Sequence, residues 1–320
     1  MRLAFSISGQ RTAPQAVAIA TLAEHRRYDE IWLTEDYCER GAFAVAGAVA
    51  AATERVTIGL GVLNPWTRHP ALTAMEFAAL DEVAGGRAVL GMGASNPHWM
   101  QTTLGIPFER PLPRLRESVE VLRAVLAGEP VEHNGETYRI SGRLAFAPVR
   151  TRPPIVLGVK GPQALALAGR IADGVLLSVL SAPAYVEWAA KQTAGSLPLG
   201  AYVLFACHLD GAQARDMVRP VVATFLGVHG EHAITRVAGL DPQLASAFRT
   251  GWITGATRVD LVDDDLVRTF AVAGDPDDCA AGIRRFADAG LQTLVIRDDG
   301  RANPERLLDN AQACFGLANP

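Results

Sequence analysis

The 320-residue sequence predicts an α/β fold, a (β/α)8 TIM barrel with a helical insertion before the last strand. Three observations support this prediction. About eight short segments have the character of strands, and a helical segment follows most of them. The predicted strands are apolar almost throughout, as in parallel sheets that are covered on both faces. No GxGxxG motif follows the first predicted strand, which argues against an open dinucleotide-binding sheet.

The first part of the chain contains four predicted strand–helix pairs. The strands are expected at residues 3–8, 30–34, 56–63 and 88–92, and the helices at 14–27, 43–53, 72–84 and 115–126. Thr12 is suited to cap the first helix, because a hydroxyl oxygen accepts a hydrogen bond from a free amide of the first turn. The helix at 43–53 lies in an apolar run, which indicates burial in the core or against a partner.

The rest of the chain contains one excursion and one long insertion. His133-Asn134-Gly135-Glu136 predicts a hairpin turn between short strands. The alternation then resumes with strands at 155–159, 174–178 and 199–209 and helices from Pro162 and at 184–191. Residues 211–270 show helical stretches and no clear strand. A helix at 276–289, a strand at 293–296 and a helix at 304–315 follow, so we expect a single domain over residues 1–320.

Composition excludes several classes of protein. The net charge is −4, from 30 basic and 34 acidic residues, which argues against a nucleic-acid partner. No apolar run is long enough to cross a bilayer, and no signal peptide is recognisable, so we expect a cytoplasmic protein without a membrane partner. The four cysteines form no CxxC pair and are expected to be reduced, buried small residues. His229 and His232 lack a further convergent ligand, so no metal site is predicted.

Two glycine-marked segments lie where predicted strands give way to helices. The first covers residues 59–70, and the second begins with Gly158-Val159-Lys160-Gly161-Pro162. Ligands of parallel α/β proteins bind at such junctions. In the second segment, small residues let the backbone approach an anion, and a helix N-terminus favours a phosphate. A plain strand-to-helix turn with a solvated Lys160 is the alternative.

Several motifs occur together in a characteristic order. They lie at residues 28–36, 61–70, 80–87, 110–111, 114–117, 158–174 and 274–276. With them, nearly the whole chain resembles the luciferase-like monooxygenase superfamily, and within it the coenzyme F420-dependent branch that includes methylenetetrahydromethanopterin reductases. The resemblance implies a barrel, a homodimer and a flavin-type cofactor at the C-terminal ends of the strands. It also implies hydride transfer through the central ring of that cofactor.

The resemblance also implies positions for the cofactor. Similar proteins have a non-proline cis peptide at the position of Gly61 and Val62, in a bulge that backs the deazaflavin ring. From the residues alone, a glycine at a strand bulge is the favoured explanation of this pair, and the resemblance reverses that preference. The predicted cofactor-binding residues are Gly61, Val62, Asn64, Ser95, Gly158, Val159, Lys160, Gly161 and Pro162. Lys160 is expected to pair with the phosphate or the acidic tail, and Trp66 to wall the substrate cavity or pack in the core.

Four residues are the predicted catalytic candidates: Glu35, Asp36, Asn96 and His98. The two carboxylates close the second strand, where they polarise substrate or move a proton, or else form a helix cap or a salt bridge. Many relatives have a histidine at the position of Asp36. Methanopterin reductases have an aspartate at that of Asn96, and an amide cannot act as a general acid. His98 is the candidate proton donor, with a surface loop residue as the alternative.

The function predicted from these residues is that of an F420-dependent oxidoreductase. It transfers a hydride between the deazaflavin and a carbon centre of a small organic substrate, such as an enone, imine, alcohol or pterin. The alternative is an FMN-dependent monooxygenase of the same superfamily. A second alternative is a flavin-binding protein without catalysis.

Overall fold

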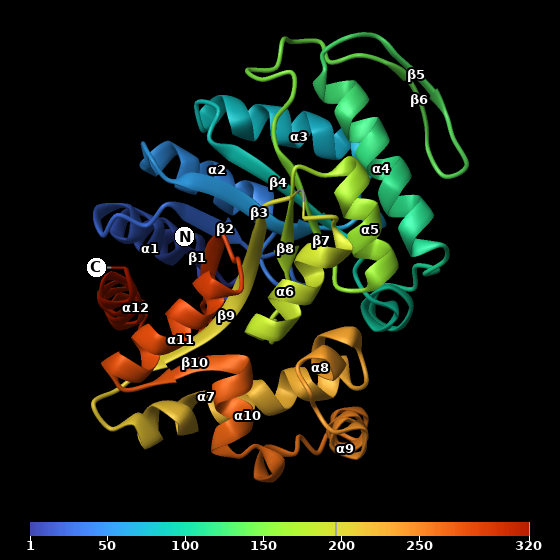
Figure 1. The fold of residues 1–320 in the computed structure, drawn as a ribbon. Coiled ribbons are helices and arrows are strands. Elements are labelled where there is room, and N and C mark those ends of the chain that lie inside the picture. Colours follow the sequence, from blue (N-terminus) through green and yellow to red (C-terminus); the bar gives the residue numbers. More distant parts are fainter. Residues whose placement is uncertain (196, 320) are drawn as a thin grey trace. The chain divides into compact units, whose positions relative to one another are not determined.

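The computed structural model describes residues 1–195 and 197–319 of the chain, in which strands and helices alternate (Figure 1). The chain divides into two compact units. The N-terminal unit comprises residues 7–159 and 167–176, and the C-terminal unit comprises residues 1–6, 160–166 and 177–320. Each unit is described by itself below. The expectation of a single domain stays a prediction.

The N-terminal unit is built on parallel strands. β2 (Glu30–Leu33), β3 (Thr57–Leu63), β4 (Ala88–Gly93), β7 (Ile155–Gly158) and β8 (Gly174–Leu177) pair in this order. Most of their residues are buried whichever way they point, because the strands are covered on both faces. This burial explains why the strands are apolar almost throughout.

Four helices connect and flank these strands (Figure 1). They are α1 (Ala13–His25), α2 (Ala42–Ala52), α3 (Pro70–Val83) and α4 (Pro111–Leu126). The predicted cap of the first helix is confirmed: the Thr12 hydroxyl accepts from the Gln15 amide, and the Gln15 side chain accepts from the Thr12 amide. A π-helix, η1 (His98–Thr103), follows β4 and was not predicted.

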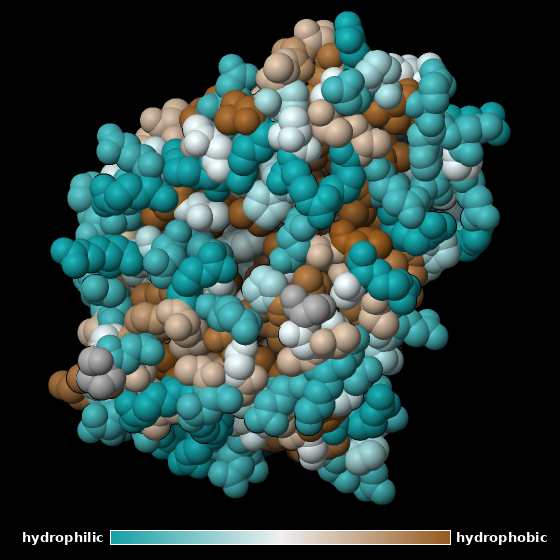
Figure 2. Space-filling model, turned by 45° about the horizontal axis from the view of Figure 1, so that its top comes forward, coloured by the Kyte–Doolittle hydropathy of each residue, from teal (hydrophilic) through white to brown (hydrophobic). Residues whose placement is uncertain are grey.

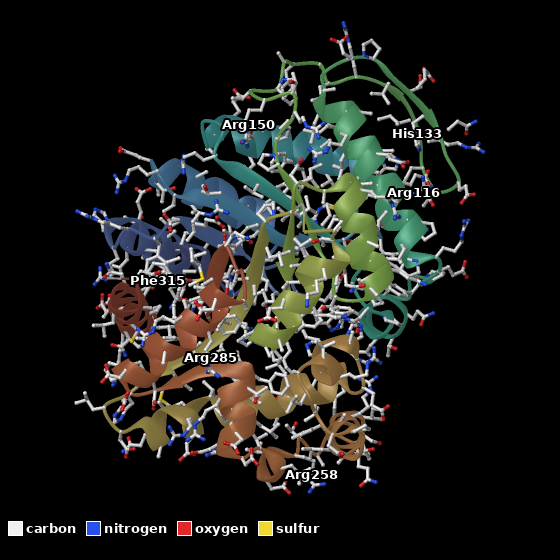
Figure 3. The ribbon with its side chains drawn as sticks, viewed as in Figure 1. Arg116, His133, Arg150, Arg258, Arg285 and Phe315 are labelled. Atoms are coloured by element: carbon white, nitrogen blue, oxygen red, sulfur yellow. The ribbon has the colours of Figure 1, made fainter. Side chains whose placement is uncertain are left out.

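The predicted hairpin is confirmed as the antiparallel pair β5 (Val131–Asn134) and β6 (Arg139–Gly142). Glu117 of α4 holds it by accepting from the Thr137 and Tyr138 amides, and it contacts His133 Nε2 at 3.1 Å. Burial raises the pKa of Glu117, but these hydrogen bonds outweigh it and leave the pKa below its usual value. Figure 3 shows His133 on the hairpin and Arg116 on the neighbouring helix.

The C-terminal unit has its own parallel strands. β1 (Arg2–Ile7), β11 (Thr293–Arg297), β9 (Leu199–Cys207) and β10 (Ala271–Gly274) pair in this order. The helices α6 (Pro183–Gln192), α11 (Pro276–Asp288) and α12 (Pro304–Ala318) belong to this unit. α5 (Pro162–Ile171) begins in it and ends in the N-terminal unit.

The predicted insertion is helical. It comprises α7 (Gly211–His229), α8 (Ala233–Val237), α9 (Pro242–Ile253), the 3-10 turn η2 (Val259–Leu261) and α10 (Asp264–Phe270). These helices contribute Val222, Leu226, Phe248 and Phe270 to an apolar cluster that they share with β9 and β10. The predicted bounds, residues 211–270, agree with these helices, but the strand that follows directly at residues 271–274, β10, was not predicted. It pairs with the last four residues of β9, a strand of nine residues.

The eight strands β1, β2, β3, β4, β7, β8, β9 and β11 are the parallel strands of a (β/α)8 TIM barrel, as the sequence predicts. β10 is an addition to this pattern. Among the residues described, no helix is both long and apolar enough to cross a membrane. Polar and charged residues cover most of the face shown in Figure 2, with apolar side chains between them.

Candidate functional site

A bulge interrupts β3 where the sequence predicts the cofactor site. The peptide bond between Gly61 and Val62 is cis, as the resemblance implies. The register between β3 and β4 shifts from Leu60 to Leu63, so the strand leaves the regular ladder over two residues.

The Val62 side chain of this bulge lies against glycines of the two next strands. A Cβ at Gly91, Gly93 or Gly158 would lie 2.9, 2.8 or 2.9 Å from a Val62 methyl carbon, respectively. Side chains at these positions would overlap Val62, because carbon atoms in contact stay about 3.5–4.0 Å apart. The structure thus brings Gly61, Val62 and Gly158 together, as predicted, and adds Gly91 and Gly93. The signal for the last two was Gly91-Met92-Gly93 at the end of a strand.

A hydrogen-bonded cluster around Tyr37 lies beside the end of this strand. Asn64 Nδ2 donates to the Tyr37 hydroxyl at 2.9 Å, and that hydroxyl lies 3.1 Å from Ser95 Oγ. Burial raises the pKa of Tyr37. The hydrogen bond with Ser95 lowers it, but the negative charges of Glu35 and Asp36 raise it, and the pKa is above its usual value. Tyr37 therefore keeps its proton at neutral pH.

The cluster joins two of the predicted residues, Asn64 and Ser95, through one that was missed. Asn64 Oδ1 also accepts from the Trp66 and Thr67 amides at 2.9 and 3.1 Å, which shapes the turn after β3. Tyr37 carried no motif of its own in the sequence. Its position one residue after the acidic pair at the end of β2 was the available signal.

Glu35 is engaged in a two-pronged ion pair. Its carboxylate oxygens accept from Arg68 Nη1 at 2.6 Å and Nη2 at 2.9 Å, and one oxygen also accepts from the Ala42 amide at the start of α2. Hydrogen bonding to Glu35 raises the pKa of Arg68. This arrangement is the salt bridge and helix cap that the sequence left as the alternative to catalysis. Asp36, the next residue, is half-buried.

Asn96 and His98 lie at the start of η1. Asn96 precedes the helix, and its Oδ1 accepts from the Trp99 amide of the first turn at 3.0 Å. His98 is exposed. The exposure of His98 agrees with its alternative as a surface residue, and the catalytic roles of Asn96 and His98 stay predictions.

Trp66 packs within the N-terminal unit. Its indole Nε1 donates to the Ala94 carbonyl at 2.8 Å, and its ring lies 4.8 Å from that of Phe108. The guanidinium of Arg114 lies over the same indole at 4.2 Å. Arg114 Nε is buried and has no hydrogen-bond partner among the described residues. Arg114 is thus a second residue that the site prediction missed.

In the C-terminal unit, Lys160 precedes α5, whose first residue is Pro162. The Lys160 ammonium donates to His229 Nδ1 at 3.2 Å, and His229 Nε2 donates to the Val179 carbonyl at 3.0 Å. Burial lowers the pKa of His229 to about 3, with the Lys160 charge acting in the same direction, so the imidazole is neutral. Burial also lowers the pKa of Lys160, and the charge of Arg249 adds to this effect.

Lys160 is therefore a mostly buried cation beside a neutral histidine. No carboxylate pairs with it in the parts of the chain that the structure describes. His232, the other histidine considered for metal binding, accepts from the Ile234 amide and begins α8. The cofactor-binding roles of Gly158, Val159, Lys160, Gly161 and Pro162 stay predictions.

Comparison with known proteins places the chain in a family. Residues 2–293 match the luciferase-like monooxygenases. The chain is 33% identical over 304 residues to a 5,10-methylenetetrahydromethanopterin reductase of Methanolobus tindarius, covering 90% of this chain and 91% of that protein. It is 27% identical over 320 residues to an F420-dependent glucose-6-phosphate dehydrogenase of Microbacterium testaceum, covering 94% and 92%.

A solved structure agrees with these similarities. The coenzyme F420-dependent tetrahydromethanopterin reductase of Methanopyrus kandleri superposes with a TM-score of 0.85 at 27% identity, over 97% of each chain. The TIM-barrel prediction and the resemblance found in the sequence are both confirmed. The chain belongs to the luciferase-like monooxygenase family.

Proposed function

We propose that this protein is a coenzyme F420-dependent oxidoreductase that transfers a hydride between the deazaflavin and a carbon centre of a small organic substrate. One observation carries the proposal: over nearly its whole length the chain is similar to F420-dependent enzymes of two activities, a reductase and a dehydrogenase. When bound, F420 supplies the redox chemistry, because its central ring accepts or donates the hydride.

The N-terminal unit has features that fit the ring of such a cofactor. The bulge at Gly61 and Val62 lies near the end of β3, and parallel α/β proteins bind ligands at strand ends. Asn64, Tyr37 and Ser95 form a polar cluster beside it, suited to hydrogen-bonding a ring carbonyl. The backbone at Gly61-Val62 and the Asn64 side chain would hold the ring in this proposal.

Lys160 fits an anionic group of the cofactor, its phosphate or its acidic tail. A mostly buried ammonium without a carboxylate partner gains charge-assisted hydrogen bonds when an anion binds. Lys160→Met should weaken F420 binding by roughly 10- to 100-fold, from the loss of about 1.5–3 kcal/mol. The matched control is Lys191→Met, since Lys191 is exposed on α6. Equal affinities of the two variants would contradict this role.

The residues at the end of β2 have distinct roles in this proposal. Glu35 is a positioning residue, because both of its carboxylate oxygens are held by Arg68. The Tyr37 hydroxyl retains its proton at Oη and so is available as a hydrogen-bond donor. Asp36, Asn96 and His98 are the proposed groups for orienting substrate and transferring a proton.

The test of the function is an anaerobic turnover assay with chemically reduced F420. We expect the absorbance of oxidised F420 to return when an enone, imine, ketone or methylenetetrahydromethanopterin is added as acceptor. A His98→Ala variant that turns over more slowly with unchanged F420 affinity would support proton transfer by His98. F420 binding without turnover on any acceptor would favour a flavin-binding protein without catalysis.

An FMN-dependent monooxygenase is the second candidate, since the matching family is described by that activity. It predicts that reduced FMN yields an oxygenated product from the same substrates when the assay is run with oxygen present. The proposal would be overturned if the protein consumed oxygen in a substrate-dependent way with FMN and transferred no hydride with F420.

We further propose a homodimer that uses α2 and α3. Ala44 and Ala48 of α2 are exposed, and so are Leu72 and Met75 of α3, at 52% and 49%. Exposed apolar side chains on neighbouring helices are typical of surfaces that a partner covers. The sequence predicts that the apolar run at 42–52 is buried either in the core or against a partner. In the structure this helix has both a buried and an exposed side.

A further inference from the structure

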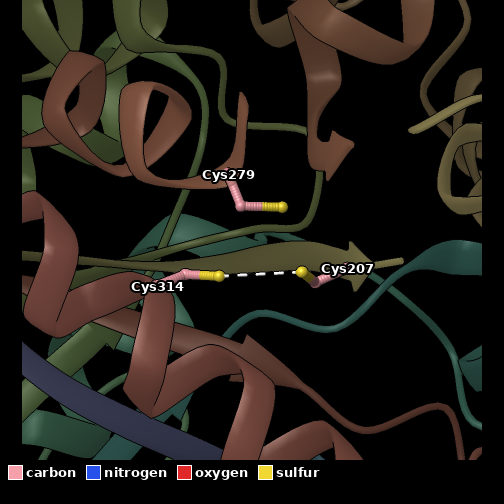
Figure 4. A group of neighbouring side chains, drawn as sticks. All are labelled: Cys207, Cys279 and Cys314. Carbon is pink, nitrogen blue, oxygen red and sulfur yellow. Dashed lines mark hydrogen bonds between the residues drawn. The ribbon is translucent and has the colours of Figure 1, made fainter. Parts of the chain in front are cut away.

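Three cysteines that are far apart in the sequence lie together in the C-terminal unit. Cys207 ends β9, Cys279 lies in the first turns of α11, and Cys314 belongs to α12 (Figure 4). Their three sulfur atoms all lie within 4.8 Å of one another, and those of Cys207 and Cys314 are 3.7 Å apart. The sequence predicts four reduced, buried cysteines. Cys279 and Cys314 are free and buried as predicted, whereas Cys207 is half-buried and Cys38 is exposed.

The sulfur separations match those of a metal–thiolate site. A tetrahedral Zn²⁺ ion binds thiolates at about 2.3 Å, which places its sulfur ligands about 3.8 Å from each other. The Cys207–Cys314 separation of 3.7 Å already has this value. The third sulfur, at most 4.8 Å away, needs a shift of about 1 Å or less, which small changes of side-chain torsion can supply.

The side chain of Cys279 is already oriented toward the end of the strand that holds Cys207. Cys279 Sγ donates to the carbonyls of Ala206 and Gly274 at 3.4 and 3.6 Å, so it already points toward the end of β9.

Access and ligand number also fit. Cys279 and Cys314 are buried and Cys207 is half-buried, which leaves a route from solvent to one side of the cluster. Three protein ligands leave the fourth position of a tetrahedral ion for water. The three ligands come from one strand and two helices, each held by its own packing.

We propose that Cys207, Cys279 and Cys314 form a binding site for one thiophilic metal ion, with Zn²⁺ as the ion that fits best. Binding converts the three thiols to thiolates and releases their protons to solvent, and no sulfur is oxidised. The site is independent of the proposed F420 chemistry, since none of the three cysteines is assigned to it.

The first test is titration of the reduced, metal-free protein with Co²⁺, followed by displacement with Zn²⁺. We expect a thiolate-to-cobalt charge-transfer band that saturates at one ion per chain and disappears when Zn²⁺ is added. Cys207→Ser should weaken metal binding by at least about 10-fold. Loss of a group that only hydrogen-bonds to a metal ligand already costs this much affinity, and loss of the ligand itself should cost no less. Cys38→Ser is the matched control, because Cys38 is exposed and belongs to the other unit.

A second test uses the unmodified protein, in case the variants do not fold. Iodoacetamide labelling read by mass spectrometry should modify Cys207 slowly with Zn²⁺ and faster without it, while Cys38 reacts equally in both. The proposal is overturned if no charge-transfer band forms, or if Zn²⁺ leaves labelling of Cys207 unchanged. The proposal would also be overturned if Cys207 and Cys314 formed a disulfide and the cluster bound no metal ion.

Discussion

Replacing Gly158 with alanine tests how the bulge of β3 is packed. The new methyl would lie 2.9 and 3.0 Å from the two Val62 methyl carbons. Ordinary carbon contacts are about 3.5–4.0 Å, so Val62 must retreat by about 0.5–1 Å. Val62 is β-branched and stiff at χ1, and Gly91 and Gly93 already leave it no spare room. Overpacking of this kind costs about 1–3 kcal/mol of unfolding free energy.

A double-mutant cycle shows whether Val62 causes this loss. Val62→Ala alone removes two half-buried methyl groups and should cost about 1 kcal/mol. In that background Gly158→Ala should cost close to nothing, so the interaction energy should be about 1–3 kcal/mol. Gly161→Ala is the matched control, because a Cβ there meets nothing within 4 Å.

The assay is urea unfolding followed by tryptophan fluorescence for the four members of the cycle and the control. We expect Gly161→Ala to stay within about 0.5 kcal/mol of the unmodified protein. The reasoning is refuted if Gly158→Ala is as mild as Gly161→Ala. It is equally refuted if its cost is the same with and without the Val62 methyl groups.

Three further predictions concern charge, pH and assembly. Glu35→Gln removes the ion pair with Arg68 and should lower the unfolding free energy by about 1–3 kcal/mol. F420 affinity, measured by fluorescence titration, should stay within a few-fold of that of the unmodified protein. An unchanged urea midpoint would contradict this prediction. His229 is neutral when folded, with a pKa of about 3 against 6.5 unfolded. Because the unfolded chain alone takes up the proton, stability should fall from pH 6.5 downward by up to about 1.4 kcal/mol per pH unit. Urea midpoints between about pH 6.5 and pH 5 should show this slope. His229→Gln should reduce it, and His232, whose pKa burial lowers to about 4, accounts for the slope that remains. An equal slope in both proteins would refute the assignment. Met75→Arg should shift light scattering from dimer to monomer, while Met217→Arg, an exposed position on α7, should not; a dimer in both variants would place the interface elsewhere.

The fold was predictable because its determinants are local. Apolar strands, helix caps such as Thr12 and the turn at 133–136 each leave a signal within a few residues. β10 left a weak one: it has four residues directly after α10, and it exists because β9 extends far enough to pair with it. Pairing between strands that are distant in the sequence depends on the tertiary structure, and a short window of sequence gives no information about it.

The candidate site was predictable in part. Gly61, Val62, Asn64, Ser95 and Gly158 were found from glycine spacing and the family resemblance, and the structure brings them together in the N-terminal unit. Whether they bind the cofactor stays a prediction. The prediction for Glu35 and Asn96 was less informative. The chemistry of a side chain does not reveal that its oxygens already accept hydrogen bonds from other residues.

Contacts between distant residues were beyond prediction from one sequence. Tyr37 joins Asn64 to Ser95 through hydrogen bonds that span 27 and 58 residues. Cys207 and Cys314 meet across 107 residues. No local pattern encodes such pairs, because they depend on which strand ends and helices the fold places side by side.

The most direct test of the proposed function is a pair of titrations of the purified, cofactor-free protein, one with coenzyme F420 and one with FMN. Cofactor fluorescence and its polarisation report binding in both. The proposal predicts tight binding of F420 and weak binding of FMN. Preference for FMN would contradict it and assign the protein to the oxygen-using members of the family.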